Sequence, residues 1–443
     1  MSSKRLEIIK EAGIVGAGGA GFPTHVKLDA KVDTLIVNAA ECEPLINVDK
    51  QLLEFYFEKV YSGMKTASDL LGAGRVVLAI KEKNKKAIEA IESFNGDGFD
   101  FELAKLGDFY PAGDEQVLVN EITEKVVPEG GIPLQVGVVV INVETLLNIA
   151  NALEGKKVID KYVTVNGEVE KPMTLLVPLG TGVGELIDYC GGVKGEGRVV
   201  LDGGPMMGKI IDPASYSIKK TTKSILVLPE DNVVIENKKR TISADLKRAQ
   251  AICLSCRMCT DLCPRYLLGH GLFPDELMKR LYKGSLSDED IQRFDFAYLC
   301  CDCGLCELYS CVVDLSARSV FNYLKEELAR LGIENPHNRK DLEVNEFRQF
   351  RKVPVSRLIK RLEIDKYGSP TPLSEFTAGT KRIKLYLSQH VGAPAVPVVS
   401  EGSTVKRGDL AADIPEGKLG TRIHSSIDGT VREVGKDYLI IEK

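Results

Sequence analysis

Two cysteine runs, Cys253-x2-Cys256-x2-Cys259-x3-Cys263-Pro264 and Cys300-x2-Cys303-x2-Cys306-x4-Cys311, decide the organisation of the chain. Each run begins with three cysteines at intervals of three, so that one tight loop can present three thiolates to one face of a cubane cluster. In two-cluster ferredoxins the fourth, remote cysteine ligates the other cluster, and a proline follows it. The spacing therefore predicts two [4Fe–4S] clusters, one on Cys253, Cys256, Cys259 and Cys311, the other on Cys263, Cys300, Cys303 and Cys306.

Zinc is the competing metal, because cysteines separated by two residues also build tetrahedral sulfur sites. Two three-cysteine runs, each completed by a fourth cysteine, fit iron–sulfur clusters better. Cys301 follows Cys300 directly, and either could be the first ligand of the second run. The CxxCGxC spacing favours Cys300.

The composition limits the class of protein. A chain of 443 residues is long enough for three or four domains. Its net charge of −5 argues against a nucleic-acid-binding protein, which would usually be basic. Only Cys42, Cys190 and Cys301 lie outside the predicted ligand set, and this usage fits a reducing cytosol better than a disulfide framework. The chain shows no secretory signal and no apolar run of about 18 residues, so we expect a cytoplasmic protein without an integral membrane segment.

The first third of the chain alternates between helix and strand patterns. Residues 32–39 and 75–80 read as buried strands, and helical patterns cover 49–71 and 82–94. This alternation predicts an α/β sheet, in which ligands bind at the carboxyl ends of the strands. The segment Asn38 to Pro44 lies at such an end. Its two glutamates could bond ribose hydroxyls or a nicotinamide amide, or could belong to a solvated loop.

A glycine-rich segment runs from Gly13 to Pro23, ahead of the first strand. Glycines let backbone N–H groups approach an anion closely and adopt positive φ. The segment lacks the Lys-Ser/Thr pair of a P-loop and does not follow a predicted strand. A phosphate-binding loop and a flexible turn are both consistent with these residues.

Three segments resemble a known family. They are Gly16-Ala-Gly-Gly-Ala-Gly-Phe-Pro23, Val37-Asn-Ala-Ala-Glu-Cys-Glu-Pro44 and Asn142-Val-Glu-Thr145. They are similar to the FMN/NADH motifs of the 51-kDa subunit of respiratory complex I and, more closely, to its RnfC-type relatives. The resemblance implies a Rossmann-like domain whose glycine-rich loop holds FMN and whose acidic loop receives NADH, with Lys27 as a phosphate partner. Carried over by position, the FMN and NADH contacts would be Gly16, Gly18, Gly19, Gly21, Phe22, Lys27, Asn38, Glu41, Glu43, Gly113, Asp114, Glu115, Asn142, Glu144 and Thr145. Ala40 and Leu45 depart from the complex I pattern, which has an acid and a glycine there.

Beyond Lys161 the pattern changes to short strands and turns. Tyr162 to Gly167 reads as a strand entering a hairpin, because Asn-Gly is the strongest two-residue turn signal. This region resembles the β-grasp SLBB domain of the same family, and the last residues read as a lipoyl-like barrel-sandwich. We therefore expect a multidomain α/β protein: an FMN/NADH-binding domain at 1–155, an SLBB β-grasp domain at 156–240, a helical dicluster ferredoxin-like domain at 241–335, a basic linker at 336–370 and a barrel-sandwich hybrid domain at 371–443.

The linker contains a run of basic residues between Arg348 and Lys366. A solvated helix face is one interpretation of such a run. The other is docking of an acidic electron carrier, such as flavodoxin or ferredoxin, by electrostatic steering.

The order of the domains narrows the resemblance. RnfC-type subunits carry the sandwich domain before the flavin domain, whereas here it is expected last. This order, the run Cys300-Cys301-Asp-Cys-Gly-Leu-Cys306 and the segment Arg351 to Leu362 resemble the cobalamin reductases of propanediol-utilisation microcompartments over essentially the whole chain. The familiar cobalamin-binding Asp-x-His-x-x-Gly pattern is absent from the sequence.

The narrower resemblance implies an NADH-dependent oxidoreductase. Its cofactors would be FMN and two [4Fe–4S] clusters, and its final acceptor cob(III)alamin or cob(II)alamin. Its partners would be cobalamin or a cobalamin-handling adenosyltransferase, inside a bacterial microcompartment. One alternative is an RnfC-like subunit that passes electrons between NADH and ferredoxin, flavodoxin or a reductase partner. A second is an iron–sulfur scaffold that has lost its flavin.

Overall fold

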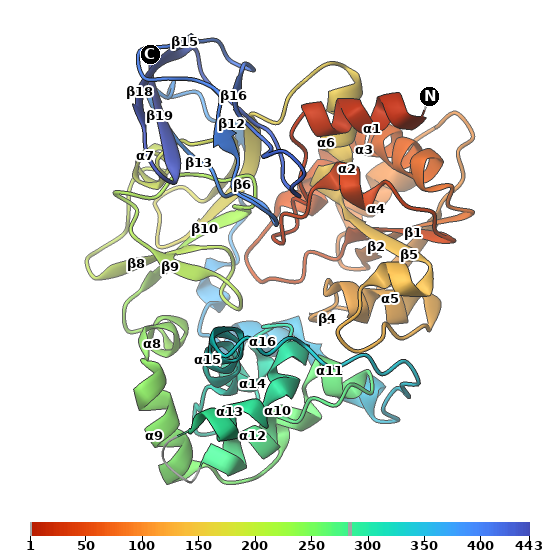
Figure 1. Cartoon of the computed structure of the whole chain (residues 1–443), viewed down its shortest axis with the longest axis vertical. Coiled ribbons are helices and arrows are strands. Elements are labelled where there is room, and N and C mark those ends of the chain that lie inside the picture. Colours follow the sequence, from red (N-terminus) through yellow and green to blue (C-terminus); the bar gives the residue numbers. More distant parts are fainter. Residues whose placement is uncertain (1, 282–285) are drawn as a thin grey trace.

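The computed structural model describes residues 2–281 and 286–443 and arranges them in four packed regions (Figure 1). The amino-terminal α/β region lies beside two β regions, and a helical region lies below them as drawn. The multidomain α/β architecture expected from the sequence is confirmed. Within the described residues, no helix has the length and apolar character needed to cross a membrane.

The α/β region is built on a parallel sheet whose strand order is β3-β2-β1-β5. Its strands are β1 (Thr34–Ala39), β2 (Arg75–Lys81), β3 (Glu102–Leu106) and β5 (Val138–Asn142). Asn38 of β1 pairs with Asn142 of β5, so two predicted site residues lie side by side at the carboxyl end of the sheet. This is the edge at which α/β sheets bind ligands.

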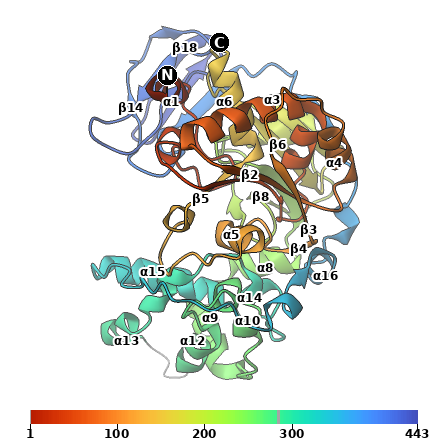
Figure 2. The same ribbon diagram turned by 90° about the vertical axis from the view of Figure 1, so that its right-hand side faces the viewer.

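Two long helices, α3 (Val48–Leu71) and α6 (Val143–Leu153), pack closely against one another. A Cβ atom on Gly63 would lie 2.0 Å from the carbonyl oxygen of Leu146, so only glycine allows this approach. The other elements of the region are α1 (Ser2–Glu11), α2 (Thr24–Lys27), α4 (Lys85–Glu92), β4 (Phe109–Tyr110), α5 (Glu115–Thr123) and a short 3-10 helix at Pro133–Val136. Helix α5 lies between the parallel sheet and the helical region (Figure 2).

The second region is a six-stranded mixed sheet with the order β12-β7-β6-β10-β8-β9. Its elements are β6 (Asp160–Gly167), β7 (Met173–Pro178), α7 (Val183–Tyr189), β8 (Arg198–Asp202), β9 (Lys209–Ile211), β10 (Ser224–Pro229) and α8 (Val233–Lys239). Strand β12 (Leu373–Glu375) comes from the carboxyl-terminal part of the chain and pairs parallel to β7.

The predicted strand and hairpin are confirmed, since β6 pairs antiparallel with β7, but the predicted position of the turn at Asn166-Gly167 is wrong. Both residues remain in β6 and pair with β10, and the connection to β7 follows them. Gly167 has φ +94°, and a Cβ there would lie 2.0 Å from the carbonyl oxygen of Val227. The glycine is thus explained by close approach between two strand backbones, a tertiary cause that local turn statistics do not detect.

The helical region carries both cysteine runs on short helices joined by loops. It consists of α9 (Ile242–Ile252), α10 (Met258–Asp261), α11 (Pro264–Leu267), α12 (Pro274–Arg280), α13 (Asp288–Gln292), a 3-10 helix at Asp295–Leu299, α14 (Leu305–Leu308) and α15 (Ala317–Arg330). Fully buried side chains of α15, among them Phe321, Leu324 and Leu328, form the centre of its apolar core.

The segment that follows returns to the α/β region. It contains 3-10 helices at Arg348–Phe350 and Asp365–Tyr367, strand β11 (Val353–Pro354) and helix α16 (Val355–Arg361), and β11 pairs with β4. Most of its basic side chains are paired within the chain: Arg348 and Lys352 with Glu121, Arg351 with Asp261, Arg361 with Asp314, and Lys366 with Glu168. These pairs tie the segment to the other regions, while Arg357 and Lys360 of the same run are exposed.

The carboxyl-terminal region contains two small sheets, β13-β19-β18-β15 and β14-β16-β17. The strands are β13 (Arg382–Tyr386), β14 (Val396–Pro397), β15 (Thr404–Val405), β16 (Leu410–Asp413), β17 (Ile423–His424), β18 (Gly429–Val434) and β19 (Tyr438–Glu442). This region contacts the glycine-rich segment, because the Val391 N–H donates to the carbonyl oxygen of Gly21 at 3.0 Å.

A buried lysine joins three regions. Lys220 Nζ donates to the carbonyl oxygens of Gly13 at 2.7 Å and Arg422 at 2.6 Å, and burial lowers the pKa of Lys220 to about 7. Between pH 7 and the lysine's ordinary pKa the unfolded chain binds more protons than the folded one, so this group makes the free energy of unfolding rise with pH. We expect urea unfolding at pH 7.5 and 9.5 to show a smaller rise in Lys220→Met than in the unaltered protein. Equal rises in the two proteins would contradict this assignment.

Candidate functional site

A cavity of about 620 Å³ lies where the α/β region, the six-stranded sheet and the helical region meet. Its α/β wall includes Gly18, Gly19, Asn38, Glu41, Glu43, Gly113, Asp114 and Asn142, all of them predicted flavin or nicotinamide contacts. Its other walls contain Lys209, Lys219 and Lys223 from the second region and Cys301 and Cys303 from the second cysteine run. We refer to it as the flavin cavity.

The glycine-rich segment forms one wall of the flavin cavity without side chains. The Gly16 N–H donates to the carbonyl oxygen of Phe22 at 2.9 Å, which closes the loop. The Ala17 N–H donates to Thr145 Oγ1 at 3.0 Å, which fixes the loop to the start of α6. A Cβ on Gly19 would meet no atom within 4 Å, so the loop leaves free volume where a side chain would otherwise project.

Polar side chains at the strand ends hold the floor of the flavin cavity in place. Asn38 Nδ2 donates to the carbonyl oxygen of Gly113 at 2.9 Å. Asn142 Nδ2 and Lys223 Nζ both donate to Asp49 Oδ2, at 2.8 and 2.6 Å. Asp49 Oδ1 is buried and has no hydrogen-bond partner, as expected for an oxygen that a bound ligand or water satisfies.

The acidic loop after β1 places its two glutamates differently. Glu41 accepts a hydrogen bond from the Asp49 N–H at 2.8 Å. Glu43 accepts from the N–H groups of Met206 at 3.1 Å and Met207 at 2.7 Å, in the turn of the six-stranded sheet. Burial raises the pKa of both glutamates, and for Glu41 the carboxylate of Asp49 raises it further. The Cys42 thiol between them has its pKa raised to about 11 by burial, so it is neutral at pH 7.

Seven predicted contacts do not line the flavin cavity: Gly16, Gly21, Phe22, Lys27, Glu115, Glu144 and Thr145. Gly16, Phe22 and Thr145 hold the glycine-rich loop through the hydrogen bonds that close it and fix it to α6. Lys27 Nζ pairs with Glu115 at 2.8 Å, so the predicted phosphate partner is engaged with a carboxylate. Glu144 is buried and pairs with Lys161 of β6, joining α6 to the second region.

Asp114 connects the flavin cavity to the helical region. Its carboxylate caps α5 by accepting from the N–H groups of Gln116 and Val117, and it takes two bonds from Arg265, at 2.7 and 2.9 Å. Burial alone would raise the pKa of Asp114, but Arg265 and the N–H donors hold it below its ordinary value. The carboxylate is therefore an ionised anchor between two regions.

The structure brings the eight cysteines together in two groups. Cys253, Cys256, Cys259 and Cys311 line one small cavity, and Cys263, Cys300, Cys303 and Cys306 line another, together with Cys301. Each group takes three cysteines from one run and the remote cysteine from the other, the partition that a two-cluster ferredoxin needs. Cys306 also borders the first cavity, so the two are adjacent. Within residues 2–281 and 286–443, no three His, Cys, Asp or Glu side chains are grouped as a single metal ion would need.

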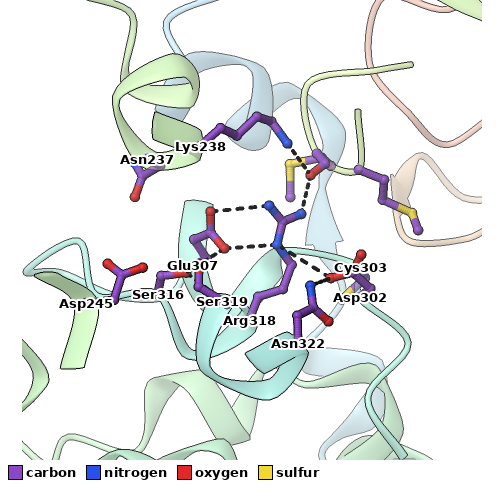
Figure 3. Close-up of polar contacts among 12 residues, drawn as sticks. Asn237, Lys238, Asp245, Asp302, Cys303, Glu307, Ser316, Arg318, Ser319 and Asn322 are labelled. Atoms are coloured by element: carbon purple, nitrogen blue, oxygen red, sulfur yellow. Dashed lines mark hydrogen bonds and ion pairs between the residues drawn. The ribbon is translucent and has the colours of Figure 1, made fainter. Parts of the chain in front are cut away.

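The second cysteine group borders the flavin cavity directly. Cys303 lines both cavities, and its carbonyl oxygen accepts a hydrogen bond from the buried Tyr110 hydroxyl at 2.7 Å. Figure 3 shows how this boundary is held. Arg318 donates to the carbonyl oxygen of Met206 at 2.6 Å and to Glu307 at 2.9 Å, and it lies 3.6 Å from Asp302, the residue before Cys303. Arg318 thus links the second cysteine run to the turn that Glu43 contacts.

Models of four known families match successive parts of the chain. The Nuo51 FMN-binding domain covers residues 9–151, the SLBB domain 162–209, the 4Fe-4S dicluster domain 252–316 and the RnfC barrel sandwich hybrid domain 363–442. The chain therefore has an FMN-binding domain and a 4Fe–4S dicluster domain.

The chain is similar along nearly its whole length to cobalamin reductase PduS of Citrobacter freundii. The two are 40% identical over 98% of this chain and 95% of the relative. The chain belongs to the PduS family. PduS of Salmonella typhimurium is 39% identical over the same shares. One subunit of a proton-translocating ferredoxin:NAD(+) oxidoreductase complex from Clostridium ljungdahlii is 37% identical over 59% of this chain and 56% of its own. This PduS-family protein is an electron-transferring oxidoreductase, as the sequence predicted.

The sequence patterns did not identify three lysines that line the flavin cavity. Lys209, Lys219 and Lys223 belong to the second region and face the glycine-rich loop only through tertiary packing. Lys219 Nζ lies 4.5 Å from the ring centres of Tyr216 and Tyr386, and burial lowers its pKa. No local pattern marks these lysines. Lys223 already pairs with Asp49, so Lys209 and Lys219 are the lysines of this group that could supply positive charge to a phosphate group.

The structure also bears on the choice between Cys300 and Cys301. The Asp302 N–H lies 3.4 Å from Cys300 Sγ, and the Leu315 N–H lies 3.2 Å from Cys311 Sγ, so two cysteines of different groups accept similar backbone bonds. Cys301 lines the same small cavity as Cys300 and also the flavin cavity, so the backbone bond to Cys300 is the observation that favours Cys300. We expect Cys301→Ser to keep its full iron content and Cys300→Ser to lose about half of it, because a missing thiolate releases one cluster of two. Iron analysis after anaerobic reconstitution measures this, and the reverse pattern would identify Cys301 as the ligand.

Proposed function

We propose that this PduS-family protein transfers electrons from NADH, through FMN and two [4Fe–4S] clusters, to cobalamin. The observation that carries the proposal is the flavin cavity, which has the glycine-rich loop on one wall and Cys303 of the second cysteine group on another. When bound, a flavin exchanges electron pairs with nicotinamide and single electrons with iron–sulfur clusters. Each NADH would then reduce two molecules of cob(III)alamin to cob(II)alamin, or cob(II)alamin further to cob(I)alamin.

The residues present fit both cofactors. For FMN, the glycine-rich loop leaves free volume, Asp49 offers a buried oxygen without a partner, and Lys209 and Lys219 of the second region supply positive charge. Asn38, Gly113 and Asn142 would border the ring, since they lie together at the strand ends. For the clusters, the chain supplies four cysteines around each of two adjacent cavities.

The outer cysteine group, which consists of Cys253, Cys256, Cys259 and Cys311, is the expected exit for electrons. Cys256 is exposed, and two apolar neighbours, Leu254 and Val312, keep 64% and 66% of their surface accessible. The inner group is the one that contains Cys303 and Cys306. It lies between this surface and the flavin cavity, since Cys303 borders the flavin cavity and Cys306 borders both cysteine cavities. An acceptor that contacts the surface near Cys256 would meet the end of the path farthest from the nicotinamide.

The relatives suggest where the protein works. The two full-length matches are named cobalamin reductases, which supports cobalamin, or an adenosyltransferase carrying it, as the partner, and a microcompartment as the location. The match to a ferredoxin:NAD(+) oxidoreductase subunit supports ferredoxin or flavodoxin as the alternative acceptor.

An anaerobic assay separates these acceptors. The reconstituted protein is mixed with NADH and either aquocobalamin, ferredoxin or flavodoxin. We expect the cob(II)alamin spectrum to appear at a rate that depends on FMN and on the clusters, and Cys256→Ala to abolish it. Bleaching of the flavin and clusters with cobalamin unchanged would leave a partner-specific electron-transfer subunit. If NADH bleaches neither, then the nicotinamide role of Glu41 and Glu43 is wrong.

A further inference from the structure

A second cavity, of about 750 Å³, lies on the opposite side of the acidic loop. The two cavities share Glu41, Cys42, Glu43 and Ile46, so this loop is the wall between them. The other walls are the start of α3, the turn from β2 into α4, and the segment from α16 to Leu373. Helices α4 and α16 lie on the same side of the molecule (Figure 2). The proposed path of electrons does not pass through this second cavity.

The second cavity is rich in lysine. Five lysines line it, against three glutamates: Lys50, Lys81, Lys83, Lys85 and Lys86, against Glu41, Glu43 and Glu54. Two of the glutamates are already engaged, because they accept backbone N–H groups of Asp49, Met206 and Met207. The third, Glu54, lies 4.0 Å from the exposed Lys86. Lys81 and Lys83 share a single carboxylate, that of Asp108, at 3.0 and 2.8 Å. Lys85 lies 3.7 Å from Glu82, so the four lysines around α4 face three carboxylates and keep an excess of one positive charge.

Apolar and aromatic groups complete the second cavity. Phe55 on α3 keeps 56% of its surface exposed although it borders the cavity. The opposite wall carries Ile359, Tyr367, Pro370 and Leu373 from the carboxyl-terminal half of the chain. An exposed aromatic ring next to a group of lysines is the combination that binds a nucleotide, because the ring stacks on the base and the ammonium groups pair with the phosphate.

We infer that the second cavity binds the phosphate-bearing nucleotide portion of a reactant. This inference rests on the proposed function, because the reactants of that function supply the two candidate ligands. These are the adenosine diphosphate part of a nicotinamide dinucleotide and the nucleotide loop of cobalamin. Both present a phosphate group and an aromatic base. Because the acidic loop separates the two cavities, a ligand held here lies next to the wall of the flavin cavity and does not compete for the glycine-rich loop.

A charge reversal tests the inference. Lys85 and Lys86 are exposed, with 67% and 81% of their side chains accessible, so Lys85→Glu/Lys86→Glu should fold normally. Lys406→Glu/Lys436→Glu changes the charge equally at two exposed lysines of the carboxyl-terminal region and is the matched control. Equilibrium binding of NADH, hydroxocobalamin and cobinamide, which lacks the nucleotide loop, is measured for both variants. The KM for NADH is measured with ferricyanide as acceptor.

The expected result is a loss of affinity of at least about tenfold for one reactant, with kcat unchanged. A weaker NADH interaction, with both corrinoids unchanged, identifies the dinucleotide. Weaker binding of hydroxocobalamin, with the affinity for cobinamide unchanged, identifies the nucleotide loop of cobalamin as the ligand of the second cavity. If neither reactant is bound more weakly than in the control variant, the inference is overturned. Failure of the unaltered protein to reduce cobalamin would refute the proposed acceptor alone, since the NADH measurements use ferricyanide.

Discussion

Replacing Cys303 with alanine is expected to stop electron transfer to any external one-electron acceptor, with a loss of at least about 100-fold in rate, while FMN stays bound. Cys303 is a predicted cluster ligand that borders both the flavin cavity and the inner cysteine group, as the neighbouring Cys301 also does. Without its thiolate the inner cluster loses a ligand, and the path from the flavin cavity to the outer group is interrupted. The iron content should fall by about half.

Rates with NADH and ferredoxin or cobalamin, together with iron and flavin analysis, measure this effect. Cys190→Ala is the matched control, because Cys190 is fully buried and lies outside both cysteine groups. It should keep its iron, its flavin and its rate. A Cys303→Ala protein with full iron and an unchanged rate would refute the assignment of Cys303 as a ligand.

Gly19→Leu is expected to lower FMN affinity by at least about 100-fold, because a leucine side chain there would fill part of the flavin cavity. The space next to Gly19 is empty of protein atoms, and Gly19 lines the cavity. Its φ of +119° means that any side chain also strains the backbone, so backbone strain and lost volume must be separated.

Gly98→Leu separates these two causes. Gly98 has φ +86°, is exposed and belongs to the same region, and a Cβ there would meet no atom within 4 Å, but Gly98 does not line the cavity. Both variants should lose some stability in urea unfolding, and only Gly19→Leu should lose flavin, measured by fluorescence after gel filtration. Equal flavin retention in the two variants would show that the glycine-rich loop does not hold FMN.

Sequence patterns predicted most of the architecture because those signals are local. The α/β alternation, the order of the regions and the strand ends at Asn38 and Asn142 all follow from residues close together in the chain. The prediction of a turn at Asn166-Gly167 was wrong because the cause of this glycine is not local. Gly167 is needed where the backbone of β10, which is distant in the sequence, approaches β6. The basic run after Arg348 was ambiguous in the sequence, because the acids that pair with it lie in other regions.

The sequence by itself determined the chemistry of the site. Cysteine spacing predicted two groups of four thiolates, because a cluster takes three ligands from one short loop, and the choice of Cys300 over Cys301 stays a prediction. The glycine-rich and acidic segments predicted one wall of the flavin cavity. Only the tertiary structure decided what faces that wall: Lys219 and Lys223 from the second region and Cys303 from the helical region. It also placed Lys27 against Glu115 and Asp114 against Arg265. These contacts depend on how separate regions pack, and a side chain's distant partners leave no local pattern in the sequence.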